Sequence, residues 1–167
     1  MKTTKQLAQC ALLISLALVL SYMERFFPIQ MLIPLPGIKL GLANIVTLVA
    51  LQCLGNRSAI VILVLRCILG AVFGGGITGL MFSLTGGIFS VLVMMLAEKC
   101  SWFSIFGVSI LGAAAHNIGQ ICAAMALMQT IYIVSYLPWL LLVSLLTGFA
   151  TGAMAAGVLR ILRGRVW

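Results

Sequence analysis

A group of hydrogen-bonding side chains interrupts the longest uncharged stretch of the chain, which lies between Cys100 and Arg160. His116, the only histidine, is followed by Asn117 and Gln120. On a helix, Gln120 shares a face with both, because side chains three and four positions apart are neighbours. Such groups need hydrogen-bond partners in apolar surroundings. We interpret them either as substrate-binding side chains or as hydrogen-bonding links between helices.

Arg66 is another polar side chain within an apolar stretch. A central arginine costs about 2.5–3.5 kcal/mol on insertion scales, and its guanidinium does not lose its proton. Two interpretations stay open. Arg66 faces a cavity and binds an anionic group, or it bonds helix-end carbonyls or the glycine-rich bend at residues 74–76 and orders the bundle. The full set of candidate substrate-binding residues is Arg66, His116, Asn117, Gln120, Asn44 and Lys39.

Composition identifies the class of protein. Hydrophobic residues make up 63% of the 167 residues and charged residues only 7%, against about 25% charged in soluble domains. With a mean hydropathy of +1.27, this predicts an all-α integral membrane protein with a single transmembrane domain over residues 1–167, surrounded by membrane lipid. The net charge of +8 is expected to mark cytoplasmic loops, so we expect no nucleic-acid partner.

Apolar runs predict the number of membrane-spanning segments. A helix needs about 20 apolar residues, with a range of roughly 17–25, to cross a bilayer. This criterion predicts six transmembrane helices, at residues 6–23, 40–54, 58–73, 77–97, 103–128 and 136–159. Residues 24–39 hold three of the four prolines, which do not continue a helix, and are expected to form an apolar loop. Glu24, Arg25 and Lys39 at its ends are interpreted as interfacial anchors, some of which could reach a ligand.

The distribution of basic residues predicts that both termini lie in the cytoplasm, an N-in/C-in topology. With six spans in this orientation, seven of the ten basic residues are cytoplasmic, Arg25 and Lys39 are outside, and Arg66 lies within the membrane. The cytoplasmic set is Lys2, Lys5, Arg57, Lys99, Arg160, Arg163 and Arg165. The loop at residues 24–39 is extracytoplasmic in this topology.

Side chains suited to catalysis or metal binding are scarce. The chain has no aspartate, and its two glutamates, Glu24 and Glu98, lie at opposite ends of the membrane in the predicted topology. No second histidine or nearby carboxylate joins His116, and the five cysteines are scattered without a C-x-x-C pair. We therefore predict no metal site, no disulfide, no cofactor and no enzymatic activity.

Several segments taken together resemble a known family. They are Pro36-Gly37-Ile38-Lys39-Leu40-Gly41-Leu42-Ala43-Asn44, the stretch from Arg66 through Gly70 to Gly74-Gly75-Gly76, Phe82-Ser83-Leu84-Thr85-Gly86-Gly87, and Gly112 with His116, Asn117 and Gln120. This combination covers nearly the whole chain and resembles the Gx transporter family, also labelled heptaprenyl diphosphate synthase component I. That family in turn resembles the six-helix substrate-binding S components of energy-coupling-factor (ECF) transporters.

The resemblance implies a subunit of the bacterial plasma membrane that takes up a small solute from outside. The basic residues suggest that the solute carries an anionic or strongly polar group, and an isoprenoid-like solute is also considered. Its partners would be a transmembrane T subunit and ATPase subunits. S components tend to dock through Ala-x-x-x-Ala on their first helix, and the nearest matches here are Ala11 with Ser15 and Ala17 with Ser21. The alternative is a non-catalytic membrane subunit in isoprenoid quinone or flavin metabolism or electron transfer, accessory to a polyprenyl diphosphate synthase.

Overall fold

The structure, a computed structural model, describes residues 4–26 and 41–164, and this described part contains helices and turns but no strand. Its helices are α1 (Thr4–Met23), η1 (Glu24–Phe26), α3 (Asn44–Leu54), α4 (Asn56–Gly70), η2 (Ala71–Gly75), α5 (Gly76–Glu98), α6 (Ile105–Met128), η3 (Ile131–Tyr136) and α7 (Leu137–Gly164). Most of the predicted loop at residues 24–39, including Lys39, lies outside the described residues. The prediction of an all-helical fold is confirmed for the described residues.

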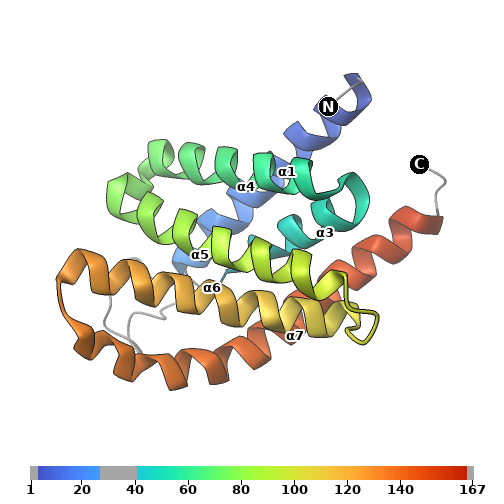
Figure 1. Cartoon of the computed structure of the whole chain (residues 1–167). Helices are drawn as coiled ribbons and strands as arrows, with labels where there is room; N and C mark the ends of the chain where they lie inside the picture. Colours follow the sequence, from blue (N-terminus) through green and yellow to red (C-terminus); the bar gives the residue numbers. More distant parts are fainter. Residues whose placement is uncertain (1–3, 27–40, 165–167) are drawn as a thin grey trace.

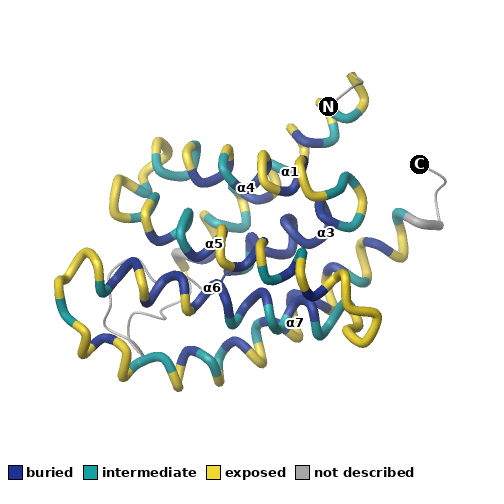
Figure 2. The backbone as a smooth tube through the Cα atoms, viewed as in Figure 1, coloured by how far each residue is buried: buried dark blue, intermediate teal, exposed yellow. Residues whose placement is uncertain are grey.

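Helices α4 to α7 run back and forth, and the start of α1 and the end of α7 lie at the same end of the bundle (Figure 1). Helix α3 is the central element, since it contacts α1, α4, α5, α6 and α7. Every residue from Asn44 to Leu51 is buried, and α3 is accordingly drawn mostly dark blue in Figure 2. The site residues that start α3 are therefore held inside the bundle.

Four stretches are long and apolar enough to cross a membrane: Thr4–Met23, Asn56–Glu98, Ile105–Met128 and Ile131–Leu162. The stretch Asn56–Glu98 includes a turn, because Phe73 (ψ 32°) and Gly74 (φ 101°) have non-helical dihedral angles, and α4 and α5 point in opposite directions on either side of it (Figure 1). These helices support the prediction of a membrane protein. They do not establish six spans.

The predicted second span, residues 40–54, is the reason that the count of six is not supported. Gly41 has a φ of 81°, a conformation that ends helical geometry, and α3 begins only at Asn44. The resulting helix has 11 residues, fewer than the roughly 17 needed to span a bilayer. Other boundaries also move: α4 begins at Asn56 and ends at Gly70, whereas residues 58–73 were predicted, and α7 continues to Gly164 instead of ending at residue 159.

Glycines allow α6 to pack closely against both of its neighbours. A Cβ built on Gly119 of α6 would lie 2.8 Å from the carbonyl oxygen of Thr85 in α5. A Cβ on Gly148 of α7 would lie 2.6 Å from Cα of Ile110, and one on Gly152 would lie 3.2 Å from Cα of Phe106. Small residues of this kind let helix backbones approach within a membrane.

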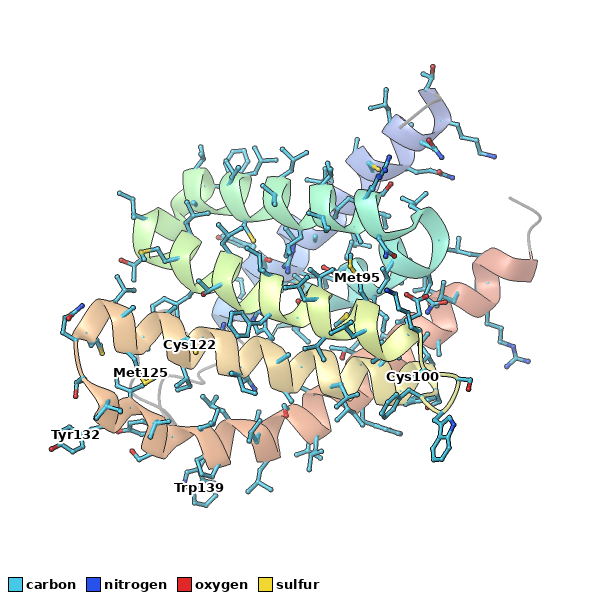
Figure 3. All side chains as sticks on the ribbon, viewed as in Figure 1. Met95, Cys100, Cys122, Met125, Tyr132 and Trp139 are labelled. Carbon is cyan, nitrogen blue, oxygen red and sulfur yellow. The ribbon has the colours of Figure 1, made fainter. Side chains whose placement is uncertain are left out.

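The outer surface of the bundle is apolar along its length. Leu12, Ile77 and Leu146 are each at least 72% exposed, and such side chains suit contact with lipid tails. Tyr132 and Trp139 project outward from η3 and α7, away from the end where Cys100 joins α5 to α6 (Figure 3). Exposed aromatic side chains of this kind are enriched where a membrane protein meets the lipid headgroups.

Candidate functional site

Four of the predicted site residues form one buried group, which we call the polar cluster: Asn44, Arg66, His116 and Gln120. Arg66 Nη2 donates a hydrogen bond to Asn44 Oδ1 at 3.2 Å, and Gln120 Nε2 lies 3.1 Å from His116 Nε2. Gly41 joins the two pairs, because a Cβ built there would lie 2.9 Å from Asn44 Nδ2 and 3.1 Å from His116 Cδ2. All four side chains are at most 6% exposed. Residues from α3, α4 and α6 thus meet at the start of α3.

Helical periodicity explains why a charged residue of α4 points inward. Arg66 follows Ile62 by four positions and Leu63 by three, and both of these side chains are completely buried. The apolar face of α4 that packs into the bundle therefore carries Arg66 with it. On α6, His116 fits because α5 has glycine opposite it: a Cβ on Gly86 would lie 2.9 Å from His116 Cε1.

The donors around Arg66 exceed the acceptors that the described residues supply. Arg66 makes one side-chain hydrogen bond, to Asn44, whereas Arg66 Nε and Asn44 Nδ2 are buried without a partner among the described residues. Leaving a buried donor unpaired costs about 1–3 kcal/mol. These two donors and the positive charge of Arg66 would stabilise a hydrogen-bond acceptor bound beside them, above all an anionic one.

A narrow cleft leads to Arg66 between α1, α4 and α5. Its cavity volume of about 20 Å³ is enough for roughly one water molecule. Besides Arg66, its lining consists mainly of small residues: Ser21, Cys67, Gly70, Ala71, Gly75, Gly79 and Ser83. The glycine-rich bend at residues 74–76, one of the predicted partners of Arg66, thus borders the same cleft, but Arg66 makes no hydrogen bond to it.

Glu24, interpreted from its position in the sequence as an interfacial anchor, is instead buried. It is only 5% exposed, and its Oε1 accepts a hydrogen bond from the backbone N–H of Leu42. This bond ties η1 to the residues just before α3, beside Gly41 and the polar cluster. No spacing rule could have indicated it, because the two partners are 18 residues apart and their separation contains prolines.

Asn117 and Lys39 are not part of the polar cluster as described. Asn117 Nδ2 donates to the carbonyl oxygen of Leu140 at 2.9 Å, so it links α6 to α7 on another side of the helix. Adjacent residues on a helix point about 100° apart, which explains why Asn117 and His116 diverge. Lys39 lies outside the described residues.

The four predicted docking residues of α1 do not share one exposed face. Ala11 and Ser15 are exposed, and Ser15 Oγ donates to the carbonyl oxygen of Ala11 at 3.0 Å. Ala17 is completely buried in the core, and Ser21 lines the cleft beside Arg66. A partner helix can therefore reach Ala11 and Ser15 but not Ala17.

Comparison with known proteins identifies the family of the chain. A model of the family described as heptaprenyl diphosphate synthase component I matches residues 13–158. No curated protein and no solved structure matches the chain. The matched residues extend from α1 into α7 and include the whole polar cluster. The chain therefore belongs to the heptaprenyl diphosphate synthase component I family.

Proposed function

We propose that this chain is the substrate-binding membrane subunit of an ECF-type transporter in the bacterial plasma membrane. The observation that carries the proposal is the state of Arg66: a positive charge, 6% exposed, whose one side-chain hydrogen bond to the described residues goes to a neutral amide. A buried charge is stable only when it is paired or solvated. A solute with an anionic group would supply the missing counter-charge, so we assign Arg66 to substrate binding.

The other members of the polar cluster would fix the orientation of that anionic group. Arg66 Nε and Asn44 Nδ2 are the donors without partners among the described residues, and they would complete charge-assisted hydrogen bonds. His116 and Gln120, already paired with each other, would border the solute on the α6 side. Asn117 we assign to helix packing, because its amide is used by α7.

In the proposed topology, with six crossings and both termini in the cytoplasm, the polar cluster lies near mid-membrane. Arg66 follows the start of α4 at Asn56 by ten residues, or about 15 Å at the helical rise. His116 follows the start of α6 at Ile105 by eleven, or about 17 Å. In this proposal α3 counts as a crossing although it is short, because protein rather than lipid surrounds it.

Solute binding would require the bundle to open. Ligand sites usually have volumes of roughly 300–1,000 Å³, whereas the cleft beside Arg66 has about 20 Å³. The hydrogen bond from the backbone N–H of Leu42 to Glu24 holds Leu42 in place, next to Gly41, which lies against the polar cluster. We propose that the solute enters when this bond breaks, so the structure corresponds to a closed state.

Coupling to ATP hydrolysis would come from partner chains, a T subunit and ATPase subunits. The exposed small residues Ala11 and Ser15 form the proposed docking surface on α1, and Ala8, exposed on the same side, extends it by one turn. Small side chains allow a partner helix to approach closely, which is the main source of helix association within lipid.

Purification of the chain followed by mass spectrometry of the bound solute tests the proposal. Arg66→Gln should weaken binding of the identified solute by about 1.5–3 kcal/mol, the usual range for a hydrogen bond to a charged group, or about tenfold to a hundredfold. Arg57→Gln is the matched control, since it removes the same charge from an exposed position of the same helix. Equal affinities in the two variants, both monodisperse, would remove Arg66 from the binding site.

The family description favours one other function, that of a non-catalytic membrane subunit accessory to a polyprenyl diphosphate synthase. A prenyl diphosphate has an anionic diphosphate group and an apolar prenyl chain. The polar cluster would suit the diphosphate group. Affinity purification of the chain from bacterial membranes separates the two functions. Recovery of ATPase and T subunits supports transport, whereas stoichiometric recovery of a soluble prenyl synthase with a bound prenyl diphosphate supports the accessory role.

A further inference from the structure

A second cavity lies far from the polar cluster, where α5, α6 and α7 meet at the bundle end marked by Cys100 in Figure 3. Its volume of about 670 Å³ is within the usual range for a bound small molecule. We call it the Glu98 groove. Its lining residues are Gln52, Glu98, Phe103, Ile105, Val108, Ala156, Leu159 and Arg160. Five of these eight side chains are apolar and three are polar, so the groove has two chemically distinct parts.

The groove carries one negative and one positive side chain that do not neutralise each other. Gln52 Nε2 donates to Glu98 Oε1 at 2.8 Å and thereby fixes the carboxylate at the wall formed by α3 and α5. Arg160 reaches the groove from α7. No ion pair joins Glu98 to Arg160, since none of their charged nitrogen and oxygen atoms lie within 4.0 Å of each other, although both residues line the same cavity. An occupant with two opposite charges would match both side chains.

The two helix ends at the groove carry partial charges of the same two signs as Glu98 and Arg160. Glu98 is the last residue of α5, where the negative end of the helix dipole favours a cation. Ile105 is the first residue of α6, whose positive end favours an anion, and Phe103 lies two residues before it. The apolar wall of the groove includes Val108 of α6 and Leu159 of α7, which are 2% and 4% exposed, and the half-exposed Phe103 lies at its outer side.

We propose that the Glu98 groove binds the headgroup of phosphatidylethanolamine. Its phosphate bonds Arg160, its primary ammonium donates to the Glu98 carboxylate, and its acyl chains lie along the apolar wall. The Glu98 carboxylate can accept hydrogen bonds from the N–H groups of an ethanolamine ammonium. The choline nitrogen of phosphatidylcholine carries methyl groups and no N–H, so it cannot form these bonds. The negative charge of Glu98 also favours a positively charged headgroup, and the glycerol headgroup of phosphatidylglycerol has no positive charge. This site is independent of the function proposed for the polar cluster.

Titration of the purified chain in detergent with short-chain phosphatidylethanolamine, phosphatidylcholine and phosphatidylglycerol tests the proposal. Thermal unfolding and native mass spectrometry report binding. The ethanolamine lipid should bind at least about tenfold more tightly than either of the others, the difference expected for one charged hydrogen bond. Glu98→Gln keeps an acceptor for Gln52 but loses the charge, and should remove that preference. Arg160→Gln should weaken all three lipids, because all three carry a phosphate.

Lys99→Gln is the matched control, because Lys99 is exposed beside Glu98 but does not line the groove. It should leave the three affinities unchanged. Equal binding of all three lipids by the natural chain would overturn the proposal. A loss in Lys99→Gln as large as in Arg160→Gln would also overturn it, since general attraction to the basic end of the bundle would then explain the binding.

Discussion

Substitution of Gly41 tests whether this residue holds the two halves of the polar cluster together. Gly41→Ala introduces a Cβ at a φ of 81°, where it would lie 2.9 Å from Asn44 Nδ2 and 3.1 Å from His116 Cδ2. A non-glycine residue in such a conformation costs about 1–3 kcal/mol. Displacing packed neighbours costs about another 1–3 kcal/mol. The free energy of unfolding should therefore fall by about 2–6 kcal/mol.

The chain contains a matched control for this substitution. Gly55 has the same φ of 81°, and a Cβ built there meets no atom within 4 Å. Gly55→Ala should therefore show the backbone cost alone, about 1–3 kcal/mol. The difference between the two variants isolates the contact of Gly41 with the polar cluster, and only Gly41→Ala should also weaken binding of the co-purified solute.

Reversible unfolding in mixed micelles, followed by circular dichroism, measures both free energies under one set of conditions. Solute affinity is measured in parallel on the folded fraction. Equal losses of stability in Gly41→Ala and Gly55→Ala, with equal solute affinities, would refute the placement of Gly41 against Asn44 and His116. A stability difference without an affinity difference would retain the contact but reject the polar cluster as the solute site.

Three further predictions concern helix packing and docking. Gly86→Ala should destabilise the chain by about 1–3 kcal/mol, because its Cβ would lie 3.0 Å from the backbone oxygen of His116, whereas Gly157→Ala, with no atom within 4 Å, should stay within about 0.5 kcal/mol in the same unfolding assay. Ser109→Ala removes the 2.8 Å hydrogen bond to Thr151 and should lower the free energy of unfolding by about 0.5–1 kcal/mol, because Thr151 keeps its hydrogen bond to the carbonyl oxygen of Gly148. A larger decrease would show that Thr151 is left without a hydrogen-bond partner. Ala11→Leu should leave solute binding intact but lower co-purification of a T subunit, and unchanged recovery would exclude this face of α1 from docking.

The helices and the burial of their polar residues could be predicted from the sequence alone. Long apolar runs predicted α1, α5 and α6 to within two residues at each end. Periodicity placed Gln120 beside His116, and the structure has their side chains 3.1 Å apart. These features depend on residues that are close in the sequence, so the helical repeat is enough to determine them.

The pairings that build the polar cluster could not be predicted in this way. Asn44 and Arg66 are 22 residues apart, and their contact depends on how α3 and α4 pack. The buried position of Glu24 depends on a bond to a backbone group across a proline-rich segment. The predicted second span also included residues 41–43, which precede α3, because hydropathy does not report the positive φ of Gly41.

The enclosure of α3 has a consequence for how the protein responds to its bilayer. Transmembrane helices in contact with lipid adjust to a thicker or thinner membrane by tilting. The eight residues Asn44–Leu51 are surrounded by protein, so lipid tails exert no direct force on them. Changes in membrane thickness therefore act on α1 and on the outer faces of α4 to α7, while the start of α3 keeps its surroundings. The side chains of the polar cluster can therefore keep the same relative positions in membranes of different lipid composition.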